Sequence, residues 1–149
     1  MKKLLPILSL LIIISCSKEI QLDQLVERNG LSYEVNNEKP FTGTTLSYHS
    51  NGQLESRIEY KDGLKVGMCE IFYENGQILI IENYKDGQFE GLVESFYEDG
   101  TLKSKANFKD GKRNGLVEFY YADSALKRKE NYKDGKYNGL VESYYANGT

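Results

Sequence analysis

Tyrosines that recur at a fixed spacing are the residues of this sequence best suited to contact a ligand. The chain has 149 residues and 12 tyrosines, and Tyr73, Tyr97, Tyr121 and Tyr145 are each 24 positions apart. Tyrosine combines a large contact area with a polar tip, so this series, together with Tyr144, is a candidate surface for binding a protein partner or a glycan. The alternative, which the strand register favours, is cross-strand packing against apolar residues of the same period. Those residues are Leu54, Ile78, Leu102 and Leu126.

The composition contains few of the residues that usually act in catalysis or bind metals. The chain has two cysteines and one histidine, His49, which occupies the tyrosine position of an earlier repeat. The sequence shows no nucleophile paired with a base, no phosphate-binding loop and no metal-ligand spacing. Its recurring aspartates and glutamates suit turns and a salt-bridged surface better than a calcium loop or a catalytic carboxylate pair. We therefore predict no enzyme, no metal site, no cofactor and no small-molecule substrate.

The charge balance argues against a nucleic-acid partner. There are 22 acidic and 19 basic residues, with a formal net charge of −3, and the sequence pI is about 5.3. Binding to a phosphate backbone depends on clustered basic residues, which this balance does not favour. A protein partner is the better expectation.

Residues 1–16 resemble a lipoprotein signal peptide. Two lysines precede an apolar run that is shorter than the about 20 residues needed to span a bilayer. The run ends in Ile-Ile-Ser-Cys, which resembles a bacterial lipobox, so we expect cleavage before Cys16 and lipidation of Cys16. The alternative is a leader that is not cleaved, or a cysteine buried in the core. Ser17 after the cysteine favours the outer membrane or cell surface over the inner membrane, so we expect a lipid-anchored protein of the cell envelope.

A 24-residue unit repeats along most of the chain. Three full units align without gaps, between a divergent first unit and an incomplete last one. The five units are 41–63, 64–87, 88–111, 112–135 and 136–149. Cys69 stands where Val93 and Val117 stand in the next two units, so a small buried side chain is predicted there.

Each unit carries the signals of two strands and two tight turns. Asp-Gly closes the units, and Asn-Gly or Asp-Gly stands midway through most of them. Both dipeptides favour two-residue type I′ turns, in which both residues have a positive φ. Asp123-Ser124 interrupts the midway pattern, and we expect a less well-defined turn there.

These turns predict a register. A two-residue turn at 99–100 sets Tyr97 opposite Leu102 and Val93 opposite Ala106. The next turn sets Ser104 opposite Val117 and Leu102 opposite Phe119, while opposite charges meet at Glu94–Lys105 and Glu118–Lys129. One face then collects Val93, Tyr97, Leu102, Ala106, Phe108, Val117 and Phe119.

The predicted fold class is all-β. We expect an elongated single-layer antiparallel meander of β-hairpin repeats, with roughly nine strands between residues 41 and 146. No segment has the helical periodicity needed to cover either face, so the core should be thin. The strand around 138–146 is expected to be an exposed edge, which invites pairing with a partner's strand.

The unit Gly-Leu-Val-Glu-Ser-Phe-Tyr, followed by Tyr-Lys-Asp-Gly, resembles MORN repeats in the variant of the bacterial YwqK-like antitoxin family. The resemblance covers 41–149 and implies a string of β-hairpins, but it transfers no catalytic or binding residue. Residues 28–33 and 40–43 also resemble the N-terminal cap of that family. The predicted organisation is therefore a signal peptide at 1–16, a linker and cap at 17–40, and repeats at 41–149.

Two functions follow from these patterns. The first is a membrane-anchored bacterial lipoprotein whose repeat array serves as a protein-interaction scaffold. The second, implied by the resemblance alone, is an antitoxin or immunity protein that binds and neutralises a specific toxin. A lipid-headgroup binder is a third possibility, which the acidic charge of the chain disfavours.

Overall fold

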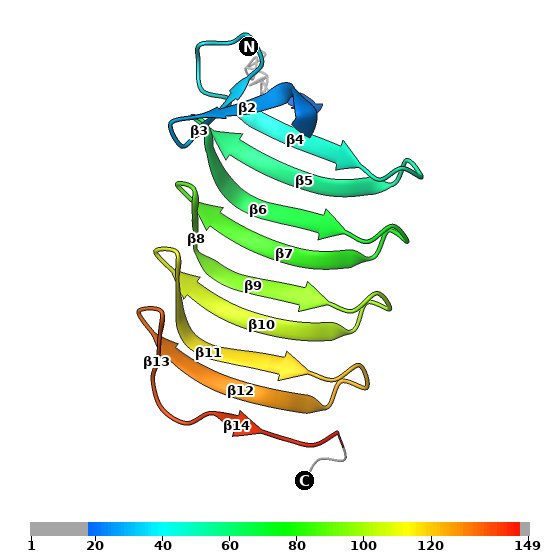
Figure 1. Cartoon of the computed structure of the whole chain (residues 1–149), viewed down its shortest axis with the longest axis vertical. Coiled ribbons are helices and arrows are strands. Elements are labelled where there is room, and N and C mark those ends of the chain that lie inside the picture. Colours follow the sequence, from blue (N-terminus) through cyan, green and yellow to red (C-terminus); the bar gives the residue numbers. More distant parts are fainter. Residues whose placement is uncertain (1–17, 147–149) are drawn as a thin grey trace, which may run out of the picture.

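The chain forms one long sheet with a small cap at its N-terminal end (Figure 1). The computed structural model describes residues 18–146, so the predicted signal peptide and its Cys16 lie outside the described residues. A short 3-10 helix, η1 (Leu22–Gln24), lies in the cap. The strands are β1 (Glu19–Gln21), β2 (Leu25–Arg28), β3 (Leu31–Glu34), β4 (Gly43–Tyr48), β5 (Leu54–Lys61), β6 (Leu64–Phe72), β7 (Ile78–Lys85), β8 (Gln88–Phe89), β9 (Gly91–Phe96), β10 (Leu102–Lys109), β11 (Lys112–Tyr120), β12 (Leu126–Lys133), β13 (Lys136–Tyr137) and β14 (Glu142–Ser143).

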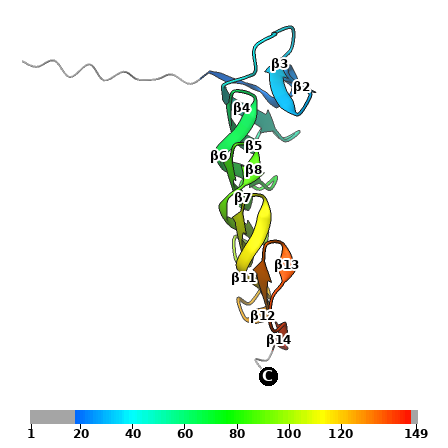
Figure 2. The same ribbon diagram turned by 90° about the vertical axis from the view of Figure 1, so that its left-hand side faces the viewer.

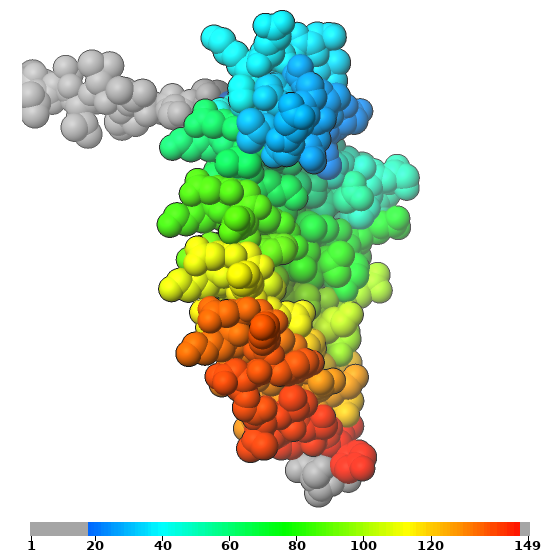
Figure 3. Space-filling view, turned by 60° about the vertical axis from the view of Figure 1, so that its left-hand side comes forward, coloured from blue at the N-terminus to red at the C-terminus, as the bar shows by residue number. Residues whose placement is uncertain are grey.

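From β4 onward, strands that are neighbours in the sequence are neighbours in the sheet, whereas β1 pairs in parallel with β4 and β2 pairs with β3 in a separate small sheet. From β4 onward every pair is antiparallel, and β8 with β9, like β13 with β14, forms one interrupted strand beside its partner. Counted in this way, nine strands follow residue 41, as predicted. The sheet is a single layer when seen from its side (Figure 2), and the hairpins follow one another as bands in the space-filling view (Figure 3). The predicted all-β meander is confirmed.

The Asp-Gly turns that close the units have the predicted type I′ geometry. Asp110 has a φ of 48° and Gly111 a φ of 74°, and φ is positive at the same two positions of the other three closing turns. Gly63 is constrained twice, because a Cβ atom there would also lie 3.0 Å from Leu31 and from the carbonyl oxygen of Ser32 in the cap. These turns therefore fix both the hairpins and the position of the cap.

The midway turns differ from the prediction. Only the glycine has a positive φ, as at Gly100 with 85°, while Asp99 does not. The amide of Gly100 donates to the carbonyl oxygen of Tyr97, and the Tyr97 amide donates to Thr101, so the loop has three residues. In this loop the Oδ1 atom of Asp99 accepts a 2.9 Å hydrogen bond from the Thr101 amide, which stabilises a turn in which only the glycine has a positive φ.

Ser124 occupies the glycine position of the last midway turn. We expected a less well-defined turn, but Ser124 has a φ of 67° and the turn keeps the same two backbone hydrogen bonds as its equivalents. The structure therefore imposes the glycine conformation on a serine, at a cost in conformational energy.

The register prediction is right along most of the β9–β10 pair, but it is wrong beside the midway turn and in the middle of the β10–β11 pair. Ser95 pairs with Ser104 and Val93 with Ala106, as expected, but Leu102 pairs with Phe96 rather than Tyr97, because a bulge follows the three-residue loop. A second bulge lies beside Gly115, which has a φ of 103°.

The second bulge changes the pairing of β10 with β11. Ser104 therefore pairs with Phe119 instead of Val117, and the predicted pairing of Leu102 with Phe119 is also wrong. Since the shift is by two residues, both strands keep their predicted faces. Glu94 with Lys105 and Glu118 with Lys129 are register partners, as predicted. The ion pairs, however, join Lys105 to Glu118 and Lys129 to Glu142.

A row of aromatic and basic side chains runs across the whole sheet beside the closing turns, and we call it the cross-strand stack. It consists of Phe41, Tyr60, Lys65, Tyr84, Phe89, Phe108, Arg113, Tyr132 and Tyr137. Ring centroids are 4.7 to 5.9 Å apart where two rings meet. Lys65 lies 5.1 Å from the centre of the Tyr84 ring, and Arg113 lies 5.3 Å from that of Tyr132. Each repeat therefore contacts the next through the same row.

The cap covers the N-terminal end of this row. Phe41, Ile58, Tyr60 and Cys69 form the buried cluster, and Ile20 and Leu25 of the cap pack against it. The cap is tied to the first repeat by hydrogen bonds, among them one of 2.9 Å from the Ser32 amide to the carbonyl oxygen of Gly63. The largest cluster of the thin core thus lies under the cap.

Cys69 is a buried structural residue, as its valine-equivalent position predicts. Only 1% of its surface is exposed. Burial, and then the negative charge of Glu82, raise the pKa of the thiol to about 11. At neutral pH the group is a protonated and weakly reactive thiol.

Replacing Ser124 with glycine should stabilise the protein. Glycine adopts a positive φ without the cost that serine bears, so the free energy of unfolding of Ser124→Gly should rise by about 1 kcal/mol. Urea unfolding measures this change. The reciprocal variant Gly100→Ser should lose a similar amount, and a Ser124→Gly protein less stable than the parent would contradict the assignment of strain to this turn.

Arg113→Ala should destabilise the array by roughly 1 kcal/mol, since it removes the cation that lies between Phe108 and Tyr132 in the cross-strand stack. Arg113→Phe should retain stability, because Phe89 fills the same position one repeat earlier. Thermal unfolding provides the comparison, and Lys109→Ala, on an exposed part of β10, is the control. If Arg113→Ala and Lys109→Ala lose the same amount of thermal stability, the contact of Arg113 in the stack does not contribute to the stability of the fold.

Cys69→Val should weaken the pH dependence of stability. A raised folded-state pKa stabilises the fold fully below the unfolded value of about 9, and this contribution is lost as the pH rises toward about 11. The parent should therefore lose more stability than the variant over this window, while the two should differ by less than about 1 kcal/mol at pH 7. Parallel curves in urea titrations from pH 7 to pH 11 would refute this role of the thiol.

Candidate partner-binding site

The predicted tyrosine series lies beside the midway turns and joins each repeat to the next. The Tyr73 hydroxyl donates a 2.8 Å hydrogen bond to the carbonyl oxygen of Phe96, and Tyr97 donates an equivalent bond of 2.8 Å to Tyr120. Tyr121 continues the series with a 3.0 Å bond to Tyr144. These hydroxyl bonds are a structural role that neither sequence hypothesis included.

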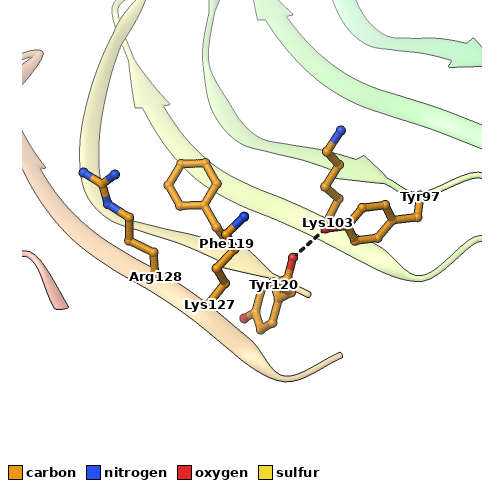
Figure 4. Close-up of a pocket in the computed structure, with 6 residues that line it drawn as sticks. All are labelled: Tyr97, Lys103, Phe119, Tyr120, Lys127 and Arg128. Carbon is orange, nitrogen blue, oxygen red and sulfur yellow. Dashed lines mark hydrogen bonds between the residues drawn. The ribbon is translucent and has the colours of Figure 1, made fainter. Parts of the chain in front are cut away.

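Four of the five candidate tyrosines also line two surface pockets. The first pocket, of about 230 Å³, is lined by Tyr97, Lys103, Phe119, Tyr120, Lys127 and Arg128 (Figure 4). The second, of about 390 Å³, is lined by Tyr121, Lys127, Arg128, Ser143, Tyr144 and Tyr145. Tyr73 lines neither of them and lies one repeat before Tyr97. We call the two pockets together the tyrosine–lysine surface.

The two pockets are successive members of one series. Each begins with a tyrosine that directly follows a strand, Tyr97 after β9 and Tyr121 after β11. Each continues with a lysine six positions later, Lys103 on β10 and Lys127 on β12. Because Lys127 and Arg128 line both pockets, the surface is continuous across β12.

The lysines of this surface lie close to the aromatic rings. The Lys103 ammonium is 5.5 Å from the centre of the Tyr97 ring, and the Lys127 ammonium is 5.2 Å from that of Tyr121. Within residues 18–146 neither lysine takes part in a salt bridge. Both are exposed, so their charges are available to a ligand.

The neighbouring cations are partly neutralised. Lys105 forms a 2.8 Å ion pair with Glu118, and Lys129 forms one of 2.6 Å with Glu142. Arg128 pairs with the buried Glu130 at 2.5 Å. Its own Nε atom is buried and has no hydrogen-bond partner in the described part of the chain. Neither pocket has a carboxylate in its lining. The surface is thus locally basic on a chain that is acidic as a whole.

The basic character belongs to the later repeats. Positions 24 residues apart along this column are Glu55, Leu79, Lys103 and Lys127. Only two of these four residues are basic, and the chain has a net charge of −3, so the sequence alone does not predict a basic surface. The tyrosines were therefore found from the sequence, while the lysines that accompany them were missed.

The described residues of this surface offer aromatic rings and positive charges to a ligand. No three His, Cys, Asp or Glu residues between positions 18 and 146 lie together in a way that would hold a metal ion. In the same part of the chain, no helix has the length and apolar character needed to cross a membrane. Tyr145 is 75% exposed, and the rings and lysines around it offer stacking and charge to a ligand.

A single-layer sheet of tandem hairpins with a repeated aromatic and basic surface defines an open β-repeat protein. Four segments, 41–62, 65–86, 89–110 and 113–134, match the family model of the MORN repeat variant. They cover more than half of the 149 residues, so the chain belongs to the MORN repeat variant family. Its repeats are those of a protein-interaction module.

Other comparisons add little to this assignment. Comparison with curated proteins gives no match. Among solved structures the chain is similar to one chain of the crystal structure of accessory secretory protein 1,2 and 3 in Streptococcus pneumoniae, with 17% identity and a TM-score of 0.39. The match covers 85% of this chain and 21% of that chain, so this chain spans about a fifth of that chain's length.

Tyr97→Phe should cost about 1 kcal/mol of stability, because it removes the hydrogen bond to the carbonyl oxygen of Tyr120 and leaves the ring in place. Tyr145→Phe is the matched control, since its hydroxyl makes no hydrogen bond within residues 18–146. Urea unfolding of both variants gives the difference. If they are equally stable, the tyrosine hydroxyls do not join the repeats energetically.

Proposed function

We propose that this protein is a lipid-anchored lipoprotein of the bacterial envelope whose repeat array binds a protein partner. The observation that carries the proposal is the tyrosine–lysine surface, where tyrosines and uncompensated lysines recur at equivalent positions of neighbouring repeats. Tyrosine is among the residue types enriched at the energetically important positions of protein interfaces. A repeat array presents them on an extended surface, which suits an extended partner.

The envelope location rests on the leader. The lipobox-like ending at Cys16 predicts that several acyl chains are attached to one residue, which anchors far better than a single chain. The repeat array would then be held at a membrane, with its binding surface available to a partner on the same side.

The anchor is tested by membrane fractionation and by metabolic labelling with a fatty acid. The parent protein should be found in the membrane fraction and carry the label, whereas Cys16→Ser should lose both. Cys69→Val is the matched control, because it removes the other cysteine and should behave like the parent. A soluble, unlabelled parent protein would overturn the lipoprotein part of the proposal.

The binding part is tested by crosslinking the membrane-anchored protein in cells and identifying the captured proteins by mass spectrometry. The proposal predicts a stoichiometric partner that is captured again by the purified protein. If no partner recurs, the interaction role fails even when the anchor is confirmed.

A second candidate is an antitoxin or immunity protein, which the resemblance of the repeat unit to the YwqK-like antitoxin family favours. This role requires that the captured partner be toxic when expressed alone and that co-expression of this chain restore growth. A captured envelope protein without toxicity would exclude it and leave the scaffold role.

A further inference from the structure

We propose, on the basis of the protein-binding function above, that the tyrosine–lysine surface binds one continuous acidic segment of the partner in the polyproline II conformation. The segment would lie across β10, β11 and β12 toward β14, with an acidic side chain at every third residue. Its carboxylates would meet Lys103 and Lys127, and its prolines would lie against the tyrosine rings.

The sign of the charge follows from the lining residues. The two pockets contain three basic residues and no carboxylate, and two of the three, Lys103 and Lys127, have no ion-pair partner within the described residues. The rest of the chain is net acidic. An acidic segment is therefore attracted to this surface and repelled from most others, which fixes where it docks.

The conformation follows from the spacing of the repeats. Lys103 lies on β10 and Lys127 on β12, so equivalent residues are two strands apart, or about 9.6 Å across the sheet. A polyproline II helix rises about 3.1 Å per residue and has three residues per turn, so its side chains recur on one side about every 9.3 Å.

Other regular conformations match this spacing less well. A β-strand repeats its side chains on one face about every 6.6 Å, and an α-helix has a pitch of about 5.4 Å. Neither length fits one repeat of the array.

The aromatic lining suits the same conformation. Tyr97 and Phe119 line the first pocket, and Tyr121, Tyr144 and Tyr145 line the second. Proline-rich segments bind in grooves lined by aromatic rings, because the extended helix is already formed and loses little conformational entropy. The lysines would thus bind the acidic residues of the partner segment, and the aromatic rings would bind the prolines between them.

Synthetic peptides provide a direct test with the full-length mature protein. The probe is Glu-Pro-Pro repeated four times with a fluorescent label, and binding is measured by fluorescence anisotropy at low salt. One control peptide has the same composition with its glutamates in one block, and another replaces each glutamate with glutamine. The spaced acidic peptide should bind at least about tenfold more tightly than either control. Equal binding of the spaced and blocked peptides would overturn the proposed register.

Two charge-reversal variants locate the site. The double variant Lys103→Glu and Lys127→Glu should weaken binding of the spaced peptide by roughly tenfold or more. Lys109→Glu with Lys133→Glu is the matched control, because these exposed lysines lie at the opposite ends of β10 and β12 and give the same change of net charge. The control should bind within about twofold of the parent. Equal losses in both variants would show general electrostatic attraction and refute the site.

The same variants separate this inference from the proposed function. A natural partner captured equally well by the parent and by the Lys103→Glu and Lys127→Glu variant would overturn the site and leave the interaction role intact. If the natural partner is lost only from that variant, the captured protein should contain an acidic, proline-rich segment. A partner without such a segment would contradict the proposed occupant.

Discussion

A single-layer sheet must cover its apolar side with residues from its own strands, and the cross-strand stack is how this chain meets that constraint. Each ring or cation of the stack lies between neighbours on the adjacent strands, from Phe41 near the cap to Tyr137 at the last described repeat. At one position of the repeat, aromatic and basic residues alternate, as in Phe89 and Arg113. Long basic side chains also provide apolar stems, so they replace a ring in packing while keeping the surface soluble.

The sheet is stabilised in different ways at the two ends of each strand. Near the closing turns the stack provides packing, and the type I′ geometry of Asp-Gly holds the strands in register. Near the midway turns the chain is looser, with a three-residue loop and a bulge, and tyrosine hydroxyls such as that of Tyr97 bond to the next repeat instead. This second arrangement leaves open space between the repeats, where Lys103 and Lys127 line the pockets. The candidate site thus lies at the midway-turn end of the strands.

The features that the sequence predicts correctly are those that depend on residue spacing or on the chemistry of a single turn. The 24-residue period, the faces of the strands, the type I′ turns at Asp110-Gly111 and its equivalents, and the buried position of Cys69 all follow from spacing and turn chemistry. The midway turns differ from the prediction because the same dipeptide fits two loop geometries, and here the three-residue loop forms, with a hydrogen bond from the Thr101 amide to the Asp99 side chain. The bulge after the midway loop compensates for the extra loop residue and returns β9 and β10 to the predicted register, whereas the bulge beside Gly115 shifts β10 against β11 by two residues.

The candidate site was predicted only in part. The tyrosines were recognised from their period, but Arg128 and the two lysines become significant only when the bulges and loops bring them beside the rings. The cross-strand stack was missed for a related reason, since its members come from two different positions of the unit. Only the pairing of Tyr84 with Phe89, or of Phe108 with Arg113, shows that the two positions form one row.

Hydrogen exchange of the Arg113→Ala variant tests most directly whether the cross-strand stack joins the repeats. In an array whose repeats contact only their neighbours, the loss of one contact lowers the local stability mainly of the adjoining hairpins. Amides of β10 to β13 should therefore exchange faster than in the parent protein, while those of β4 to β6 should be unchanged. Unchanged exchange near Arg113, or an equal increase along the whole sheet, would contradict the account.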